Sequence, residues 1–234
     1  TQNTARSALG EMTRFVELRQ RLLFLAGALI VYRIGTYIPV PGIDPNALQN
    51  FFDEQSGTIL SMFNMFSGGA LERLSIFTIG IMPYISSSII MTLMTSVVPH
   101  FEQLKEEGER GRRKITQYTR MGTVFLAVFQ SYGISIALQS QSGAGVALVT
   151  NPGLTFSFVT VLTMTTGTLF LMWLGEQITQ RGIGNGISLI IFSGIVAEIP
   201  RALATTFELG RTGALSASTI ILIFAIIIFT VAFI

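Results

Sequence analysis

Two short stretches of the chain place paired isoleucines beside a glycine. They read GIMPYI at 80–85 and GISLII at 186–191. In each stretch, two isoleucines four residues apart share one face of a helix, about 6 Å apart along its axis. Branched aliphatic side chains that converge on one axis form a hydrophobic constriction, which gates by dewetting. Ordinary packing in apolar helices is the alternative interpretation of the four residues, Ile81, Ile85, Ile187 and Ile191.

The residue types that enzymes and metal sites need are scarce. The chain has one histidine, His100, and no cysteine, and neither an HExxH nor a GxSxG pattern occurs. The GIGNG segment at 182–186 follows no strand, so it fails the context that a phosphate-binding glycine loop requires. We therefore predict that the protein is not an enzyme and carries no cofactor or metal.

The elements that must position these residues are membrane spans. Half of the chain is hydrophobic and 12% is charged, against about 25% charged in soluble domains. Several apolar runs meet the roughly 20 residues that a bilayer requires, and helices are the economical choice in hydrocarbon because they satisfy their own backbone hydrogen bonds. We predict six spans, at roughly 22–38, 76–98, 119–138, 153–175, 187–200 and 215–234.

Lys and Arg favour one orientation. They gather before the first span and between the second and third, which predicts that the N-terminus is cytoplasmic. The segment FNMFSGGALERL at 63–74 then lies on the outer side. The cytoplasmic basic segment between the second and third spans contains Lys105, Arg110, Arg112, Arg113 and Lys114.

Three features interrupt the spans. Pro83 should bend the second span, because its ring removes a helix hydrogen bond. The glycines of RGIGNGIS at 181–188 should make the entrance of the fifth span flexible. Arg33 should snorkel to the outer interface, with an ion pair as the alternative. Broken helices also suit half of a secondary solute transporter, which stays open beside a non-conducting structural subunit.

Four stretches resemble the SecY family of protein-conducting channels. They are IVYRIGTYIPVPGID, FNMFSGGALERLSIFTIGIMPYISSSII, EEGERGRRKITQYTR and WLGEQITQRGIGNGISLIIFSGIVA. The resemblance runs along nearly the whole chain. It implies an all-α, polytopic transmembrane helical bundle that forms the first half of an inverted-repeat translocon fold.

The resemblance also implies a division of the chain. Residues 1–21 are expected to be a cytoplasmic amphipathic N-terminus. Residues 22–200 should hold spans one to five, with a plug at 59–74 and a cytoplasmic loop at 99–118. Residues 201–234 should hold an outer loop and a truncated sixth span, because the chain stops inside an apolar run.

Site roles carry over from the family onto matching positions. The four isoleucines look like four of six pore-ring residues. Ser86 and Gln130 look like part of a polar patch at the lateral gate, with plain packing as the alternative. A plug that leaves and returns needs soft, adaptable contacts, which Met, Phe and Gly provide; a fixed re-entrant helix is the alternative. The central plug residues are Met62, Phe63, Asn64, Met65, Phe66, Ser67, Gly68 and Gly69.

The function implied is that of the central pore subunit of the general secretory translocon. It passes unfolded polypeptides across the bacterial plasma (inner) membrane and releases apolar segments into lipid through a lateral gate. The implied partners are SecE and SecG, the SecA motor or the ribosome, the translocating polypeptide and its signal sequence, and the lipid bilayer. The basic segment either contacts ribosomal RNA or the motor, or serves only as an orientation signal.

Overall fold

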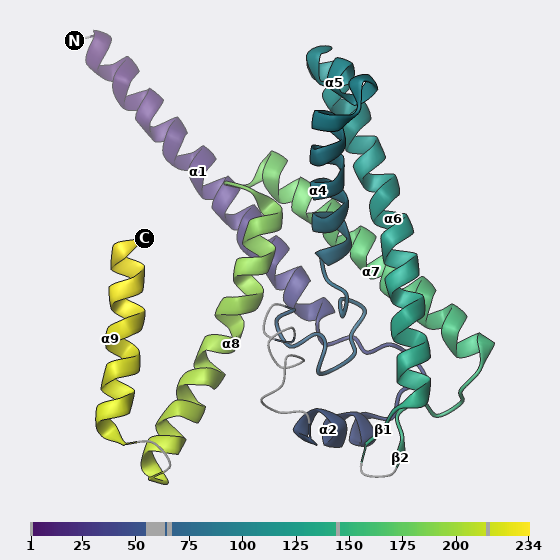
Figure 1. Cartoon of the computed structure of the whole chain (residues 1–234). Helices are drawn as coiled ribbons and strands as arrows, with labels where there is room; N and C mark the ends of the chain where they lie inside the picture. Colours follow the sequence, from purple (N-terminus) through teal and green to yellow (C-terminus); the bar gives the residue numbers. More distant parts are fainter. Residues whose placement is uncertain (1, 55–63, 65–66, 144–145, 214–215) are drawn as a thin grey trace.

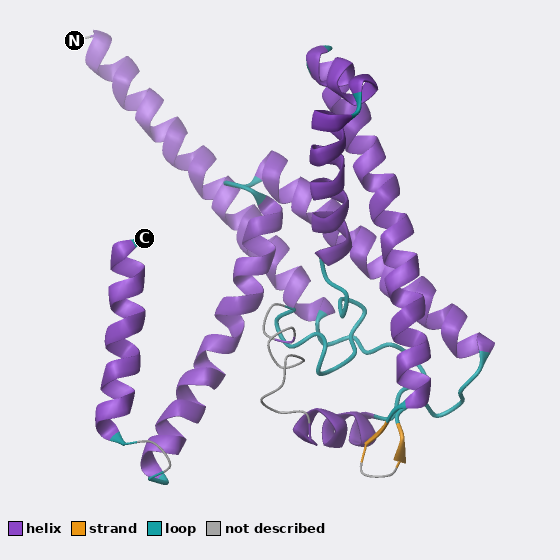
Figure 2. Cartoon of the chain, in the orientation of Figure 1, coloured by secondary structure: helices purple, strands orange, loops and turns teal. Residues whose placement is uncertain are grey.

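The chain is built almost entirely from helices, as the sequence predicts. The computed structural model describes residues 2–54, 64, 67–143, 146–213 and 216–234 (Figure 1). Figure 2 shows helices throughout and one short strand pair, β1 (Ser142–Gly143) with β2 (Val146–Ala147). The helices are α1 (Gln2–Gly35), α2 (Pro45–Glu54), α4 (Met82–Val97), α5 (Pro99–Glu106), α6 (Glu109–Ser140), α7 (Leu154–Arg181), α8 (Gly186–Arg211) and α9 (Ala217–Phe233).

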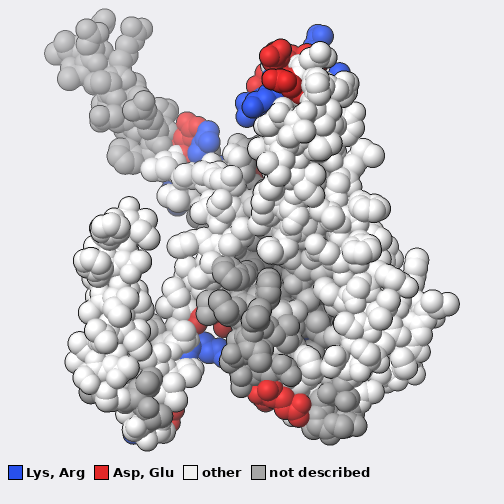
Figure 3. All heavy atoms as spheres, in the orientation of Figure 1, with Lys and Arg blue, Asp and Glu red and all other residues white. Residues whose placement is uncertain are grey.

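Three of the described helices, α6, α7 and α8, are long and apolar enough to cross a membrane. A fourth crossing is added if α4 and α5, which meet at a bend of 96°, count as one span. In the face that Figure 3 shows, charged side chains gather toward the ends of the molecule and leave a broad uncharged middle. The helices therefore form a multi-pass membrane protein.

The other two predicted spans are not among these candidates. The apolar part of α1 is flanked and interrupted by Arg19, Arg21 and Arg33. α9 is an apolar helix of 17 residues, in the place where a truncated sixth span was predicted. The predicted fifth span is too short, since α8 continues to Arg211.

The helix α7 lies at the centre of the bundle. It packs against α6, α8, α1 and α4, and it is the most buried of the three spans. Met164, Leu171 and Ile178 are at most 1% exposed. α7 therefore connects the elements that carry the two isoleucine pairs.

A stripe of small residues explains how closely α6 packs. Its buried members recur at every fourth position, which keeps them on one helix face. Between α6 and α7, the hydroxyls of Ser131 and Thr165 lie 3.4 Å apart, and Gln139 Nε2 donates to Ser157 Oγ over 2.9 Å. Small and hydroxylated residues are typical of helix contacts in membranes, because they let backbones approach. The stripe consists of Thr119, Thr123, Ala127, Ser131 and Ser135.

Two loops are tied together at the end of the bundle near α2. Val40 N donates to Leu74 O over 2.8 Å, and Ile76 N donates to Ile38 O over 2.9 Å. An apolar cluster that includes Leu48, Leu148 and Phe156 packs behind these bonds. The bonds hold residues 75–81 in tight turns, so the predicted second span begins later than expected, at Met82.

The predicted kink at Pro83 is wrong. Pro83 lies in the first turn of α4, where its missing N–H has no partner to lose and its ring suits the helix start. The chain bends instead between α4 and α5, directly before Pro99.

We predict that Ala127→Leu destabilises the bundle by about 1–3 kcal/mol, because Ala127 is fully buried and the extra methylenes must overpack the stripe. Val128→Leu is the matched control, since Val128 on the same helix is 42% exposed. Thermal unfolding in detergent, followed by the fluorescence of Trp173, measures the difference. Equal melting temperatures for the two variants would contradict the packing argument.

Candidate functional site

The starts of α4 and α8 meet around one apolar cluster. Ile81 precedes α4 and is 5% exposed, while Ile85 and Ile187 are half-buried against the same cluster. Ile191, one helical turn beyond Ile187, is half-buried but is not a member of it. The other fully buried members come from α1, α7, α8 and the turns before α4: Ala28, Tyr32, Ala70, Phe77, Leu171, Leu174, Ile178 and Ile190.

Sequence reasoning missed two residues of this cluster. Phe77 stacks between Tyr32, at 6.0 Å, and Phe170, at 5.9 Å between ring centroids. Ile190 is 2% exposed. It lies three residues after Ile187 and shares its helix face, so the same spacing argument could have included it. No pattern in the sequence marks Phe77.

The start of α8 is capped by side chains. Asn185 Oδ1 caps the helix by accepting from the backbone N–H groups of Ile187, at 3.0 Å, and Ser188, at 3.3 Å. Gly186 N donates to Thr179 Oγ1 over 2.8 Å. Side chains thus satisfy free N–H groups of the first turn, and the predicted flexibility of residues 181–188 stays a prediction.

Two glycines let α7 touch the start of α8. A Cβ added at Gly175 would lie 2.9 Å from Ile187 Cγ1, and one at Gly186 would lie 2.0 Å from Gly175 O. Real Cβ atoms do not approach so closely, so only glycine fits either position. This contact sets the position of Ile187 relative to α7.

The segment of the predicted plug that the structure describes is Asn64 and residues 67–74. Asn64 is helical and residues 67–74 form successive turns, so the expected helix does not extend over 67–74. Gly68 and Gly69 have φ of 64° and 79°, a region that glycine enters without strain. Met62, Phe63, Met65 and Phe66 lie outside the described residues.

Polar contacts hold this segment between α1 and α8. Arg33 Nη1 donates to Gly68 O over 2.6 Å, and Tyr32 Oη donates to Ser67 O over 3.3 Å. Glu72 pairs with Arg201 of α8 at 2.9 Å. Within the part of the chain that the structure describes, Arg33 pairs with no carboxylate, and its guanidinium donates to the backbone carbonyl of Gly68. That its stem snorkels to the outer interface stays a prediction.

Glu72 stays ionised in this setting. Burial alone would raise the pKa of Glu72, but the hydrogen bond and charge of Arg201, with the Asn64 amide and the charge of Arg73, outweigh it and lower that pKa. A lowered pKa keeps an ion pair intact above the ordinary titration range of the carboxyl, and the pair is lost only as pH falls through the lower value. The Glu72–Arg201 pair is therefore present at neutral pH.

Ser86 and Gln130 lie at different depths. Ser87 Oγ donates to Thr119 O over 2.7 Å, which places the neighbouring Ser86 level with that part of α6. Gln130 follows Thr119 by eleven residues, or about 16 Å along the helix. Both side chains are half-buried, and the structure does not bring them into one patch.

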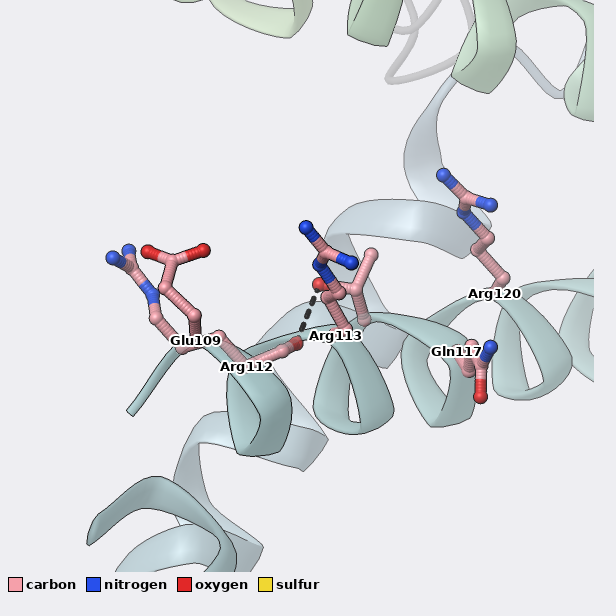
Figure 4. A pocket seen from close by; sticks show the side chains of 6 residues that line it. Glu109, Arg112, Arg113, Gln117 and Arg120 are labelled. Atoms are coloured by element: carbon pink, nitrogen blue, oxygen red, sulfur yellow. Dashed lines mark hydrogen bonds between the residues drawn. The ribbon is translucent and has the colours of Figure 1, made fainter. Parts of the chain in front are cut away.

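The basic segment is helical, not a loop. α5 and the first turns of α6 form a hairpin that holds all five predicted basic residues, each of them exposed. Part of α6 lines a groove of about 460 Å³. Figure 4 shows Arg113 and Arg120 pointing to the same side of it. Arg120 also forms a two-pronged ion pair with Glu176 of α7, with Nε to Oε1 at 3.0 Å.

The described residues hold no group of three or more His, Asp or Glu side chains that could bind a metal ion. The candidate site is therefore apolar. It consists of isoleucines at the starts of α4 and α8, and it lies beside a loop that polar contacts attach to α1 and α8.

The family model described as SecY matches residues 75–234. The protein translocase subunit SecY of Escherichia coli strain K12 is 58% identical over 217 residues, which is 93% of this chain and 48% of that protein. The SecY subunit of Pseudomonas aeruginosa is 62% identical over 197 residues, 84% of this chain and 43% of that protein. The chain thus spans about half the length of these relatives.

Solved structures give the same fold. The structure titled "Sec61 in the Canine ribosome-channel complex from the endoplasmic reticulum" aligns with a TM-score of 0.54 at 16% identity, covering 82% of this chain and 38% of that one. The structure titled "The structure of a protein conducting channel" aligns with the same TM-score, identity and coverage. These neighbours support the fold expected from the resemblance.

We predict that Gly175→Ala lowers the melting temperature by several degrees, because the new methyl group must displace Ile187 or separate α7 from α8. Gly27→Ala on α1 is the control, since a Cβ there meets nothing within 4 Å. Removing a helical glycine favours the helix by about 1 kcal/mol, so the control should be neutral or stabilised. A Gly175→Ala variant as stable as Gly27→Ala would contradict the close contact.

Proposed function

Because the chain belongs to the SecY family, we propose that it forms the first half of the pore subunit of a protein-conducting channel. The observation that carries this proposal is the family match over residues 75–234, which contains both isoleucine pairs. The same match decides against half of a solute transporter. No catalytic step is assigned to the chain; the energy for movement comes from a partner.

We propose that Ile81, Ile85, Ile187 and Ile191 contribute to the constriction. The support is geometric: three of the four lie at one cluster where α4 and α8 begin. Ile85, Ile187 and Ile191 keep part of their surface exposed, whereas Ile81 supports the ring from within the cluster. Apolar contact is non-directional and does not depend on which side chain it meets. Such a ring therefore accepts polypeptides of any sequence while it excludes ions.

The segment 59–74 is proposed as the plug that closes the outer funnel. Its described part lies beside the same cluster, to which Ala70 belongs. Turns with two glycines, and polar attachments through single hydrogen bonds beside the buried Ala70 and Leu74, suit a segment that moves out and returns. A helix packed by apolar side chains alone would suit a fixed element better.

Assembly and position in the membrane are part of the proposal. The partners are SecE, SecG, and SecA or the ribosome, and the membrane is the bacterial inner membrane with the N-terminus in the cytoplasm. The exposed basic hairpin of α5 and α6 is the surface for the motor or ribosomal RNA. Ser86 and Gln130 are proposed for the lateral gate, at two separate depths rather than as one patch.

We predict that replacing the four isoleucines with serine in the full-length subunit raises ion leak across planar bilayers at least severalfold. Serine hydroxyls hydrogen-bond to water, so the constriction fills instead of dewetting. Serine at Ile89 and Ile90, which are 55% and 50% exposed on α4, serves as the control. Conductance equal to that of the parent would show that the four isoleucines do not form the constriction.

A stalled translocating chain should also crosslink to a photoreactive residue at position 85 or 191. The control position is Phe129 on the outer surface of α6, which is 70% exposed. If position 129 crosslinked as efficiently as positions 85 and 191, the polypeptide would not pass between α4 and α8.

A further inference from the structure

The helix α4 meets α6 along one narrow face. The buried residues of α4 are Pro83, Ser87 and Thr95, whose spacings of four and eight positions keep them toward one side of the helix. Away from this side, Ile89 is 55% exposed and Leu93 is 61% exposed. The way α4 is turned about its axis therefore depends on how its small buried residues fit α6.

A single hydrogen bond ties this face of α4 to α6. Ser87, which is 2% exposed, donates from Oγ to Thr119 O over 2.7 Å. Within the described part of the chain, no other side chain of α4 bonds to another helix. Thr119 O also accepts from Thr123 Oγ1 over 2.8 Å, so that carbonyl keeps a hydroxyl partner even without Ser87.

Gly122 provides the space that the Ser87 hydroxyl occupies. A Cβ added at Gly122 would lie 2.5 Å from Ser87 Oγ but 3.5 Å from Ser87 Cβ. Real Cβ atoms do not approach as closely as the first distance, whereas the second is ordinary van der Waals contact. A side chain at position 122 would therefore displace the Ser87 hydroxyl from Thr119 O or move α4 away from α6.

Ile85 lies on the opposite side of α4 from this contact. It precedes Ser87 by two positions, which is about 200° around a helix. It packs against the apolar cluster where α4 and α8 begin. Because a regular helix turns as one body over so few residues, the fit of Ser87 on α6 decides the direction in which Ile85 points.

We propose that Ser87 and Gly122 are positioning residues of the constriction, whose contact sets the rotation of α4 and thereby directs Ile85 to the ring. This inference rests on the proposed function. A ring of side chains excludes water only while each member points to the common axis, so a turn of α4 to either side opens a gap beside Ile85. Gly175 has the corresponding place on the other side, since it sets the position of Ile187 relative to α7.

The test compares Gly122→Ala with Gly133→Ala in the full-length subunit. Gly122→Ala should raise ion conductance across planar bilayers about three- to tenfold, because the new methyl group takes the place of the Ser87 hydroxyl and the turned ring no longer dewets. Gly133→Ala makes the same change on the same helix, where a Cβ meets nothing within 4 Å. Its conductance should equal that of the parent.

A second change tests whether the contact itself is responsible. In the double variant Ser87→Ala with Gly122→Ala, the crowded hydroxyl is gone and the Cβ atoms meet at the ordinary distance of 3.5 Å. Its conductance should return to within about twofold of the parent, since residues in contact are coupled. A double variant that leaks as much as Gly122→Ala, or a Gly122→Ala variant that conducts like Gly133→Ala, would overturn the inference.

The melting temperature distinguishes positioning from packing alone. If the contact served only stability, Gly122→Ala would melt at a lower temperature in detergent while the folded channel kept the parental conductance, and this outcome also overturns the inference. Ser87→Val, which cannot donate to Thr119 O, replaces Gly122→Ala if the latter does not fold, with the same expected rise in conductance. Thr92→Val is its control, because Thr92 is exposed and bonds within α4.

The serine ring variant separates this inference from the proposed function. Raised conductance of that variant with parental conductance in Gly122→Ala rejects the positioning role and leaves the constriction standing. Unchanged conductance of the ring variant rejects the constriction and the positioning role together.

Discussion

Close approach of backbones at glycine is the constraint on which the rest of the structure depends. A Cβ at Gly167 of α7 would lie 2.0 Å from Ile76 O, and one at Gly186 would lie 2.0 Å from Gly175 O. In a bilayer, apolar side chains gain nothing by leaving lipid for one another, so helices associate where small residues allow contact. α7 therefore serves as the fixed reference against which the turns before α4 and the start of α8 are placed.

A different kind of contact holds the loop between α1 and α4. Where α7 contacts its neighbours closely at glycines, Asn64 and residues 67–74 are held by charged and amide groups in addition to the apolar clusters that contain Ala70 and Leu74. Packed glycine contacts are lost all at once when helices separate, whereas single hydrogen bonds break and re-form one at a time. The structure thus combines helices in close backbone contact with a loop to which charged side chains of α1 and α8 bind.

Sequence periodicity predicted α6, α7 and the start of α8 well, because uninterrupted apolar runs specify helices in a membrane. The turns at 75–81 were not predictable, since they depend on the bond from Ile76 to Ile38, far away in the chain. Pro83 was misread for the same reason: a proline bends a helix or starts one according to what precedes it. The Glu72–Arg201 pair also escaped prediction, because charge types in a sequence do not reveal which partners meet.

The hairpin of α5 and α6 has a mechanical consequence. A Cβ at Gly111 would lie 1.4 Å from Leu104 O, so the two helices touch along their backbones and act as one stiff arm. The arm continues into the membrane as α6, where Ser87 bonds to it from α4 and Glu176 bonds to it from α7. A force applied at the tip of the hairpin is therefore transmitted to both α4 and α7 and is not absorbed by a flexible linker.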